Sequence, residues 1–65
     1  MIAEFNGIKV KIPKGYNGPD KDGFYMNNHG VEYALVSYGW GEEQEICLET
    51  AYSRHVRTIR LEIVK

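Results

Sequence analysis

The pair Asn6-Gly7 constrains the fold of this chain more than any other feature of its sequence. Asn-Gly is the strongest short signal for a two-residue β-hairpin, because a type I′ turn needs positive φ at both central residues. A register with Phe5 opposite Ile8 gives the hairpin one apolar face. The other members of that face are Met1, Ala3, Val10 and Ile12. The sequence therefore predicts that the chain begins with a β-hairpin.

The length of the chain limits it to one small domain, residues 1–65. A domain of this size hides only about 60% of the surface that its unfolded chain exposes, so its core is small. The single cysteine, Cys47, cannot form an intrachain disulfide, which indicates a reducing compartment. No apolar run approaches the roughly 18 residues of a membrane span, and the start lacks a signal-peptide pattern. We therefore expect a cytoplasmic protein with no membrane partner.

A second hairpin is predicted after the turn-rich loop of residues 13–23. Residues 24–26 are extended in pattern, and residues 27–30 read as a type I turn followed by a bulge at Gly30. The returning strand, residues 31–38, is apolar at both odd and even positions. Such a strand is typical of a central position that is covered on both faces.

The segment 42–55 is ambiguous, because early glutamates and late basic residues suit a helix dipole while its apolar residues alternate as in a strand. We favour a strand and keep one short helix as the alternative. Residues 58–63 alternate clearly and predict a last strand. About five or six short strands without a strong amphipathic helix predict an all-β fold, a small curled barrel of the SH3-like or OB-like kind.

The sequence offers no convincing catalytic or metal-binding pattern. Residues 20–23 resemble the start of a calcium loop, but Gly18 and His29 occupy positions that need oxygen ligands, so a turn is favoured. Cys47 with His29 or His55 is a candidate nucleophile and base pair, yet Cys47 lies in an acidic segment that disfavours a thiolate. We therefore predict no enzyme activity, no metal and no cofactor.

Aromatic residues are the first candidates for binding. Trp40 lies between two glycines, so it either anchors a partner at a loop tip or folds back to plug one end of the barrel. A core this small cannot satisfy the hydroxyl groups of five tyrosines, and some tyrosines must lie at the surface. The tyrosine candidates for binding are Tyr16, Tyr38 and Tyr52.

Basic residues form the second set of candidates. Arg54 and Arg57, with Arg60 further along, can bind a phosphate or an acidic partner. The alternative is cross-strand pairing with upstream acids, which are Glu42, Glu43, Glu45 and Glu49.

Three functions follow from these features. The leading hypothesis is a non-catalytic protein-interaction module, an adaptor or inhibitor of a larger macromolecule. The second is a binder of a nucleotide-like small molecule, at a site where Lys14-Gly15-Tyr16, Trp40 and Arg54 or Arg57 converge. The third is an RNA or single-stranded DNA binding barrel, for which the net charge of −1 is unfavourable. Its basic face would hold Lys9, Lys11, Arg57 and Arg60.

A homodimer is also expected, because the last strand carries apolar residues on both faces although an edge strand is normally protected by charge. These residues are Val56, Ile59, Leu61, Ile63 and Val64. Arg60 and Lys65 argue against such pairing. Short chains with an initiator methionine also occur among phage and mobile-element products, so a phage protein is a further expectation.

Overall fold

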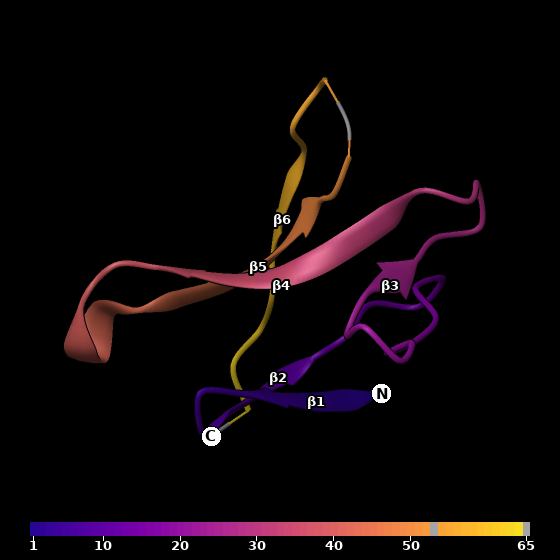
Figure 1. The fold of residues 1–65 in the computed structure, drawn as a ribbon. Coiled ribbons are helices and arrows are strands. Elements are labelled where there is room, and N and C mark those ends of the chain that lie inside the picture. Colours follow the sequence, from indigo (N-terminus) through magenta and orange to yellow (C-terminus); the bar gives the residue numbers. More distant parts are fainter. Residues whose placement is uncertain (53, 65) are drawn as a thin grey trace.

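The computed structural model describes residues 1–52 and 54–64, with Glu42 described by its main chain only. This part contains six strands and one 3-10 turn. They are β1 (Ile2–Phe5), β2 (Ile8–Lys11), β3 (Tyr25–Met26), β4 (Glu32–Tyr38), η1 (Gly41–Glu43), β5 (Glu45–Thr50) and β6 (Thr58–Arg60). One antiparallel sheet consists of β1 and β2, and the other has the order β3-β4-β5-β6 (Figure 1). The predicted all-β class is confirmed.

The predicted first hairpin is confirmed in turn and register. Asn6 and Gly7 have φ values of 52° and 79°, as a type I′ turn requires. Phe5 pairs with Ile8, and the remaining pairs of β1 and β2 follow the expected alternation. Val10 is fully buried, so the apolar face of this hairpin contributes directly to the core.

Replacement of Gly7 by valine is expected to destabilise the protein by about 1–2 kcal/mol, because a β-branched residue resists positive φ. A Cβ at Gly7 would meet no atom within 4 Å, so the cost is conformational rather than steric. The matched variant Gly7→Asn should lose less, since asparagine tolerates the left-handed region. Thermal unfolding measures both; equal melting temperatures would contradict this explanation of the turn.

The second hairpin has the predicted turn, but its returning strand is one residue shorter than predicted. Gly30 has a φ of 77° and its N–H donates to the carbonyl of Asn27, which is the expected turn with a bulge. β4 begins at Glu32 rather than at residue 31 and lies between β3 and β5, so its central position is confirmed. The prediction that both faces are covered is confirmed only in part, because most positions of β4 are half-buried and its last residue is exposed. Tyr33 is buried on one face, whereas Tyr38 on the other is 48% exposed.

The segment 42–55 contains a strand, and the alternative of a short α-helix is wrong for its described residues. β5 pairs with β4 along its whole length and with β6 over three residues. Ile46, Cys47 and Leu48 are buried in succession, because neighbouring strands pair with β5 on both sides and the core covers one face. A helix here would satisfy its own backbone groups but would leave the groups of β4 and β6 that pair with β5 without partners. Only η1 is helical, as a single 3-10 turn.

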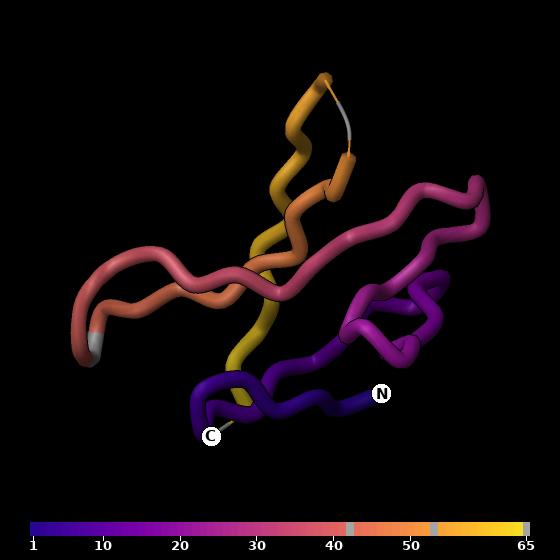
Figure 2. Tube along the Cα trace, viewed as in Figure 1, coloured from indigo at the N-terminus to yellow at the C-terminus, as the bar shows by residue number. Residues whose placement is uncertain are grey.

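The end of the chain connects the two sheets. After β6, the Leu61 N–H donates to the carbonyl of Ile46 in β5, and the Val64 N–H donates to the carbonyl of Lys9 in β2. Figure 2 shows this segment running from the four-stranded sheet to the first hairpin. The core consists of side chains from both sheets and their connections. Its buried members are Val10, Ile12, Tyr25, Tyr33, Ile46, Leu48 and Leu61. The paired strands do not close into a ring, so the barrel stays a prediction.

Candidate functional site

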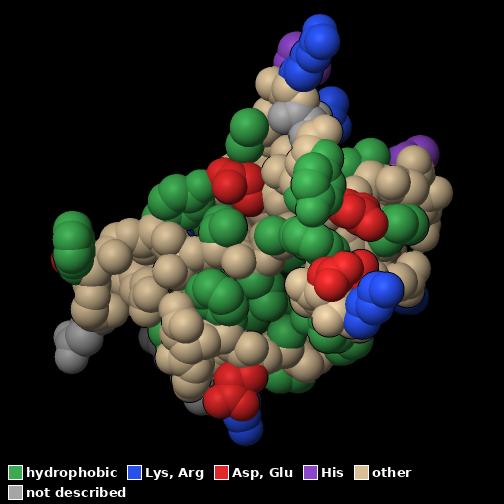
Figure 3. Space-filling view, in the orientation of Figure 1, with side chains coloured by type: hydrophobic (Ala, Val, Ile, Leu, Met, Phe, Trp, Pro, Cys, Tyr) green, Lys and Arg blue, Asp and Glu red, His purple; other side chains and the backbone are tan. Residues whose placement is uncertain are grey.

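Trp40 lies at the end of the β4–β5 hairpin and is 91% exposed. The flanking Gly39 and Gly41 have φ values of 98° and 55°, so the main chain turns sharply on both sides of the ring. Figure 3 shows a hydrophobic side chain standing apart from the others at this end of the molecule. The alternative in which Trp40 plugs one end of the fold is therefore wrong.

Tyr38 is the second exposed aromatic residue near this hairpin end. It is the last residue of β4, and its hydroxyl donates a hydrogen bond to the carboxylate of Glu49 on β5. This hydrogen bond raises the pKa of Tyr38, because the carboxylate favours the protonated phenol. Glu49 lies opposite Ala34 rather than opposite Tyr38, so this bond directs the Tyr38 side chain back along the strand pair, away from the hairpin end.

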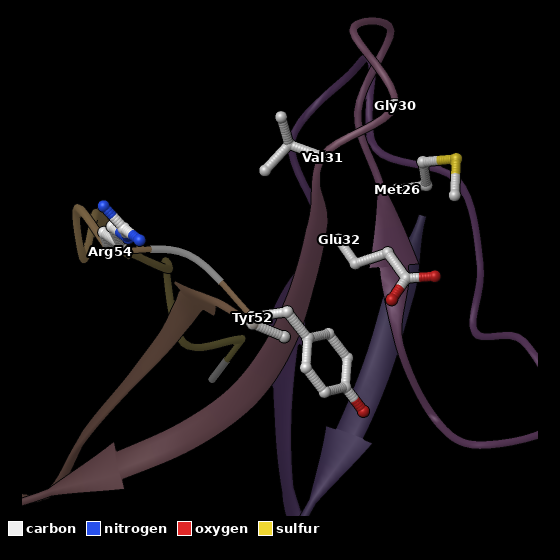
Figure 4. A pocket seen from close by; sticks show the side chains of 7 residues that line it. Met26, Gly30, Val31, Glu32, Tyr52 and Arg54 are labelled. Carbon is white, nitrogen blue, oxygen red and sulfur yellow. The ribbon is translucent and has the colours of Figure 1, made fainter.

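Tyr52 and Arg54 lie at the other end of β5, in the loop before β6. Together with Met26, Val31 and Glu32 they line an open cavity of about 500 Å³ (Figure 4). Tyr52 is 87% exposed, and its ring makes an edge contact with Phe24 at 5.8 Å between centroids.

A neighbouring cavity of about 340 Å³ is lined by Arg57. It lies between the turn of residues 27–30 and the loop before β6, and it shares Val31 with the cavity at Tyr52. Its lining residues are Asn27, His29, Val31, Tyr33, Thr50, His55 and Arg57. Among the described residues, it is lined by one arginine and two histidines and by no acidic side chain.

Tyr16 and Lys14 lie elsewhere, on the loop after β2. The Tyr16 ring packs edge-on against Tyr33, with 5.2 Å between ring centroids and an interplanar angle of 85°. Burial, followed by the nearby Tyr33, raises the pKa of Tyr16, so this tyrosine behaves as a packed residue. Lys14 and Tyr16 line a third cavity with Met1 and Ile12.

The predicted convergence of Lys14, Trp40 and Arg54 or Arg57 is wrong. Lys14, Arg54 and Arg57 line three different cavities, and Trp40 lines none of these three. A nucleotide site built from these residues together is therefore not formed.

Two of the basic residues expected to bind nucleic acid form ion pairs with glutamates. Lys11 lies 3.4 Å from Glu62, and Arg60 lies 3.1 Å from Glu45. Cross-strand pairing is thus the explanation for Arg60. Arg54 and Arg57 form no ion pair with an acidic side chain among the described residues, which do not include the side chain of Glu42. Nucleic-acid binding stays a prediction.

Cys47 is buried, with 3% of its surface exposed, on the face of β5 opposite Leu48 and Thr50. Burial and the nearby carboxylate of Glu45 raise the pKa of its thiol. His29 and His55 line the cavity on the Thr50 side of the strand. The structure therefore does not bring Cys47 together with either histidine.

Asp20 has the turn-forming role that its sequence predicts. Its carboxylate accepts hydrogen bonds from the N–H groups of Asp22 and Phe24, at 2.9 and 2.8 Å. Within residues 1–52 and 54–64, no three His, Cys, Asp or Glu side chains are grouped as metal ligands would be. No helix in the same residues is long and apolar enough to cross a membrane.

Part of the C-terminal segment on which the homodimer was based is paired within the chain. Leu61 is 5% exposed in the core, Ile63 forms a bridge with Val10, and backbone groups of Glu62 and Val64 bond to β2. β6 is nevertheless an edge strand of its sheet, and Val56 before it is 64% exposed. Lys65 lies outside the described residues. The homodimer stays a prediction.

Sequence reasoning missed Asn27 as a site residue and considered His29 only as a turn residue and as a possible base for Cys47. Their turn lies more than twenty residues before Arg57 in the sequence. The pairing of Tyr33 with Thr50 brings the two loops together, and no local pattern signals that contact.

Comparisons with known proteins supply no relative for this chain: no family model matches, and neither the curated proteins nor the solved structures contain a match. Its function must therefore be inferred from its own residues.

Proposed function

We propose that this protein is a non-catalytic binding module that docks on a larger protein, as an adaptor or inhibitor, through the end of its β4–β5 hairpin. The observation that carries the proposal is the 91% exposure of Trp40. A fully exposed tryptophan contributes nothing to the core, whereas tryptophan and tyrosine dominate the energetic centres of protein interfaces.

Contacts of the strands and of the main chain restrict the hairpin next to Trp40. Tyr38 is tied to Glu49 across the strand pair. A Cβ at Gly39 would lie 2.8 Å from the carbonyl oxygen of Glu43, so the main chain beside Trp40 is closely packed. A pre-ordered loop loses less conformational entropy on binding, which supports a role as an anchor.

The charge near the hairpin end indicates the chemistry of the partner. Glu43 is exposed in η1, whereas Glu45 on β5 is paired with Arg60 and Glu49 lies further from the hairpin end, opposite Ala34. We propose that the partner offers an apolar pocket for Trp40 with basic side chains at its border, because complementary charge steers association and excludes wrong partners.

Replacement of Trp40 by alanine is expected to weaken partner binding by at least about tenfold, since buried tryptophans are frequent interface hot spots. The same change should alter the free energy of unfolding by less than about 0.5 kcal/mol, because an exposed side chain is removed. The measurement is affinity capture from extract of the source organism with immobilised wild-type and variant proteins, followed by titration of the captured protein.

The matched control is Tyr52→Ala, which removes an 87% exposed aromatic residue from a different loop. A protein retained by wild type and by this control, but lost with Trp40→Ala, would support the proposal. Capture that survives Trp40→Ala, or the absence of any captured protein with a folded bait, would contradict it.

We also propose that the scaffold is a partly open small barrel of the SH3-like or OB-like kind. Support comes from the bridge between Val10 and Ile63 and from the bridge between Asn17 and Met26, which connect the first hairpin and its following loop to the other sheet. Such a scaffold leaves the β4–β5 hairpin free to project toward a partner.

A further inference from the structure

The cavity beside Arg57 combines cationic and hydrogen-bonding side chains from two loops. Arg57 and His55 come from the loop before β6, and His29 and Asn27 come from the turn between β3 and β4. The side chains that line it include no carboxylate among the described residues. In Figure 3, basic and histidine side chains gather at the outer end of the loop after β5. This absence of acids favours an anionic ligand over a cation.

Hydrogen bonds hold both loops in place without using the Arg57 guanidinium. The Asn27 side-chain oxygen accepts from the N–H groups of His29 and Val31, both at 2.9 Å. Across the cavity, the Thr50 hydroxyl donates to the carbonyl of His55 at 3.3 Å and accepts from the Arg57 N–H at 3.0 Å. These hydrogen bonds fix backbone groups of His29, His55 and Arg57, which lowers the cost of binding.

The neighbouring cavity at Tyr52 is not a continuation of this one. Tyr33 and Thr50 line the cavity at Arg57, whereas Met26 and Glu32 line the cavity at Tyr52, so the two cavities lie on opposite faces of β4 and share only Val31. Figure 4 shows the side chains of Val31 and Glu32 pointing to different sides at the start of β4. The Glu32 carboxylate therefore does not line the cavity at Arg57.

We infer that the cavity lined by Arg57, His29 and Asn27 binds a small molecule that carries a phosphate monoester. The planar guanidinium of arginine donates paired hydrogen bonds that match phosphate oxygens, and histidine and asparagine nitrogens supply further donors. The volume of about 340 Å³ is that of a small-ligand site rather than a nucleic-acid groove. This site is separate from the hairpin end proposed to bind a protein.

The test is NMR titration of the full chain, labelled with nitrogen-15, with inorganic phosphate, ribose 5-phosphate, AMP and adenosine at low salt. The three phosphate compounds should shift the amides of residues 27–31 and 54–57, and adenosine should not. Tighter binding of AMP than of ribose 5-phosphate identifies a nucleotide ligand, whereas equal affinities identify a sugar phosphate. Shifts that are absent, that lie on other residues, or that adenosine reproduces would overturn the inference.

The decisive variant is Arg57→Gln, which should weaken binding of the phosphate compounds by at least about tenfold. Its matched control is Arg60→Gln, which removes the same charge from a residue already paired with Glu45. The control should change the affinity by less than about twofold, because an exposed, paired arginine outside the cavity attracts the ligand only through screened charge. Equal losses in both variants would overturn the site, since they indicate general charge attraction. The amide spectrum of each variant verifies its folding.

Discussion

Replacement of Leu48 by alanine is expected to lower the free energy of unfolding by about 2–5 kcal/mol. Leu48 is fully buried in β5, opposite Leu35 of β4 on one side and Ile59 of β6 on the other. Its removal leaves a cavity among strands whose pairing prevents collapse around it. A domain of this length has a total stability of only about 3–10 kcal/mol, so the variant should melt at least about 10 °C lower.

The control for this prediction is Ile2→Ala, which also removes a strand hydrophobe. Ile2 is 52% exposed in β1 and lies opposite Lys11 on the outer face of the first hairpin. Its loss should cost less than about 1 kcal/mol, because little apolar surface returns to water. Chemical denaturation of both variants gives the two values. A Leu48 variant as stable as the Ile2 variant would show that the core is not centred on β5.

Replacement of Gly18 by alanine is expected to destabilise the protein by about 2–4 kcal/mol, through a positive φ and a steric clash together. The φ of Gly18 is 156°, and a Cβ there would lie 2.7 Å from the carbonyl oxygen of Phe24 and 3.1 Å from Tyr25. That oxygen accepts the Asp20 N–H, and the bridge between Asn17 and Met26 holds the same segment. The neighbours of the new methyl group therefore cannot move without breaking hydrogen bonds.

The variant Gly23→Ala separates the cost of the positive φ from the cost of the steric clash. Gly23 lies in the same loop with a φ of 87°, but a Cβ there would meet no atom within 4 Å. Its replacement should cost only the conformational part, about 1–2 kcal/mol. In urea titrations, the free energy of unfolding of Gly18→Ala should be at least about 1 kcal/mol lower than that of Gly23→Ala. Equal stabilities would refute the steric argument.

The two hairpin turns are features that local sequence is sufficient to predict. Asn6-Gly7 and Gly30 supply residues that adopt positive φ easily, and both turns form where the sequence places them. The segment 42–55 could not be assigned with the same ease, because its early glutamates and late basic residues suit a helix dipole while its apolar residues alternate as in a strand. The pairing of β5 with both β4 and β6 decided for the strand.

The candidate sites were predicted residue by residue, but their grouping was not. Trp40 was singled out from its flanking glycines, and its exposure agrees with one of the two alternatives considered. Lys14 and Arg57 were expected to share a site, whereas they line different cavities. His29, a turn residue by sequence, lines the same cavity as Arg57. Spacing along the chain could not reveal this, because loop proximity depends on which strands pair.

The sequence by itself determined the local elements of this protein, since turn residues and alternating side chains act over a few neighbouring positions. It determined the first hairpin, the bulged turn at Gly30 and the all-β class. Only the tertiary structure decided that the C-terminal segment pairs with β2 and that the turn carrying His29 faces the loop carrying Arg57. Such long-range contacts depend on the order of the strands in each sheet and on the burial of side chains in one shared core. No short stretch of residues specifies either of these.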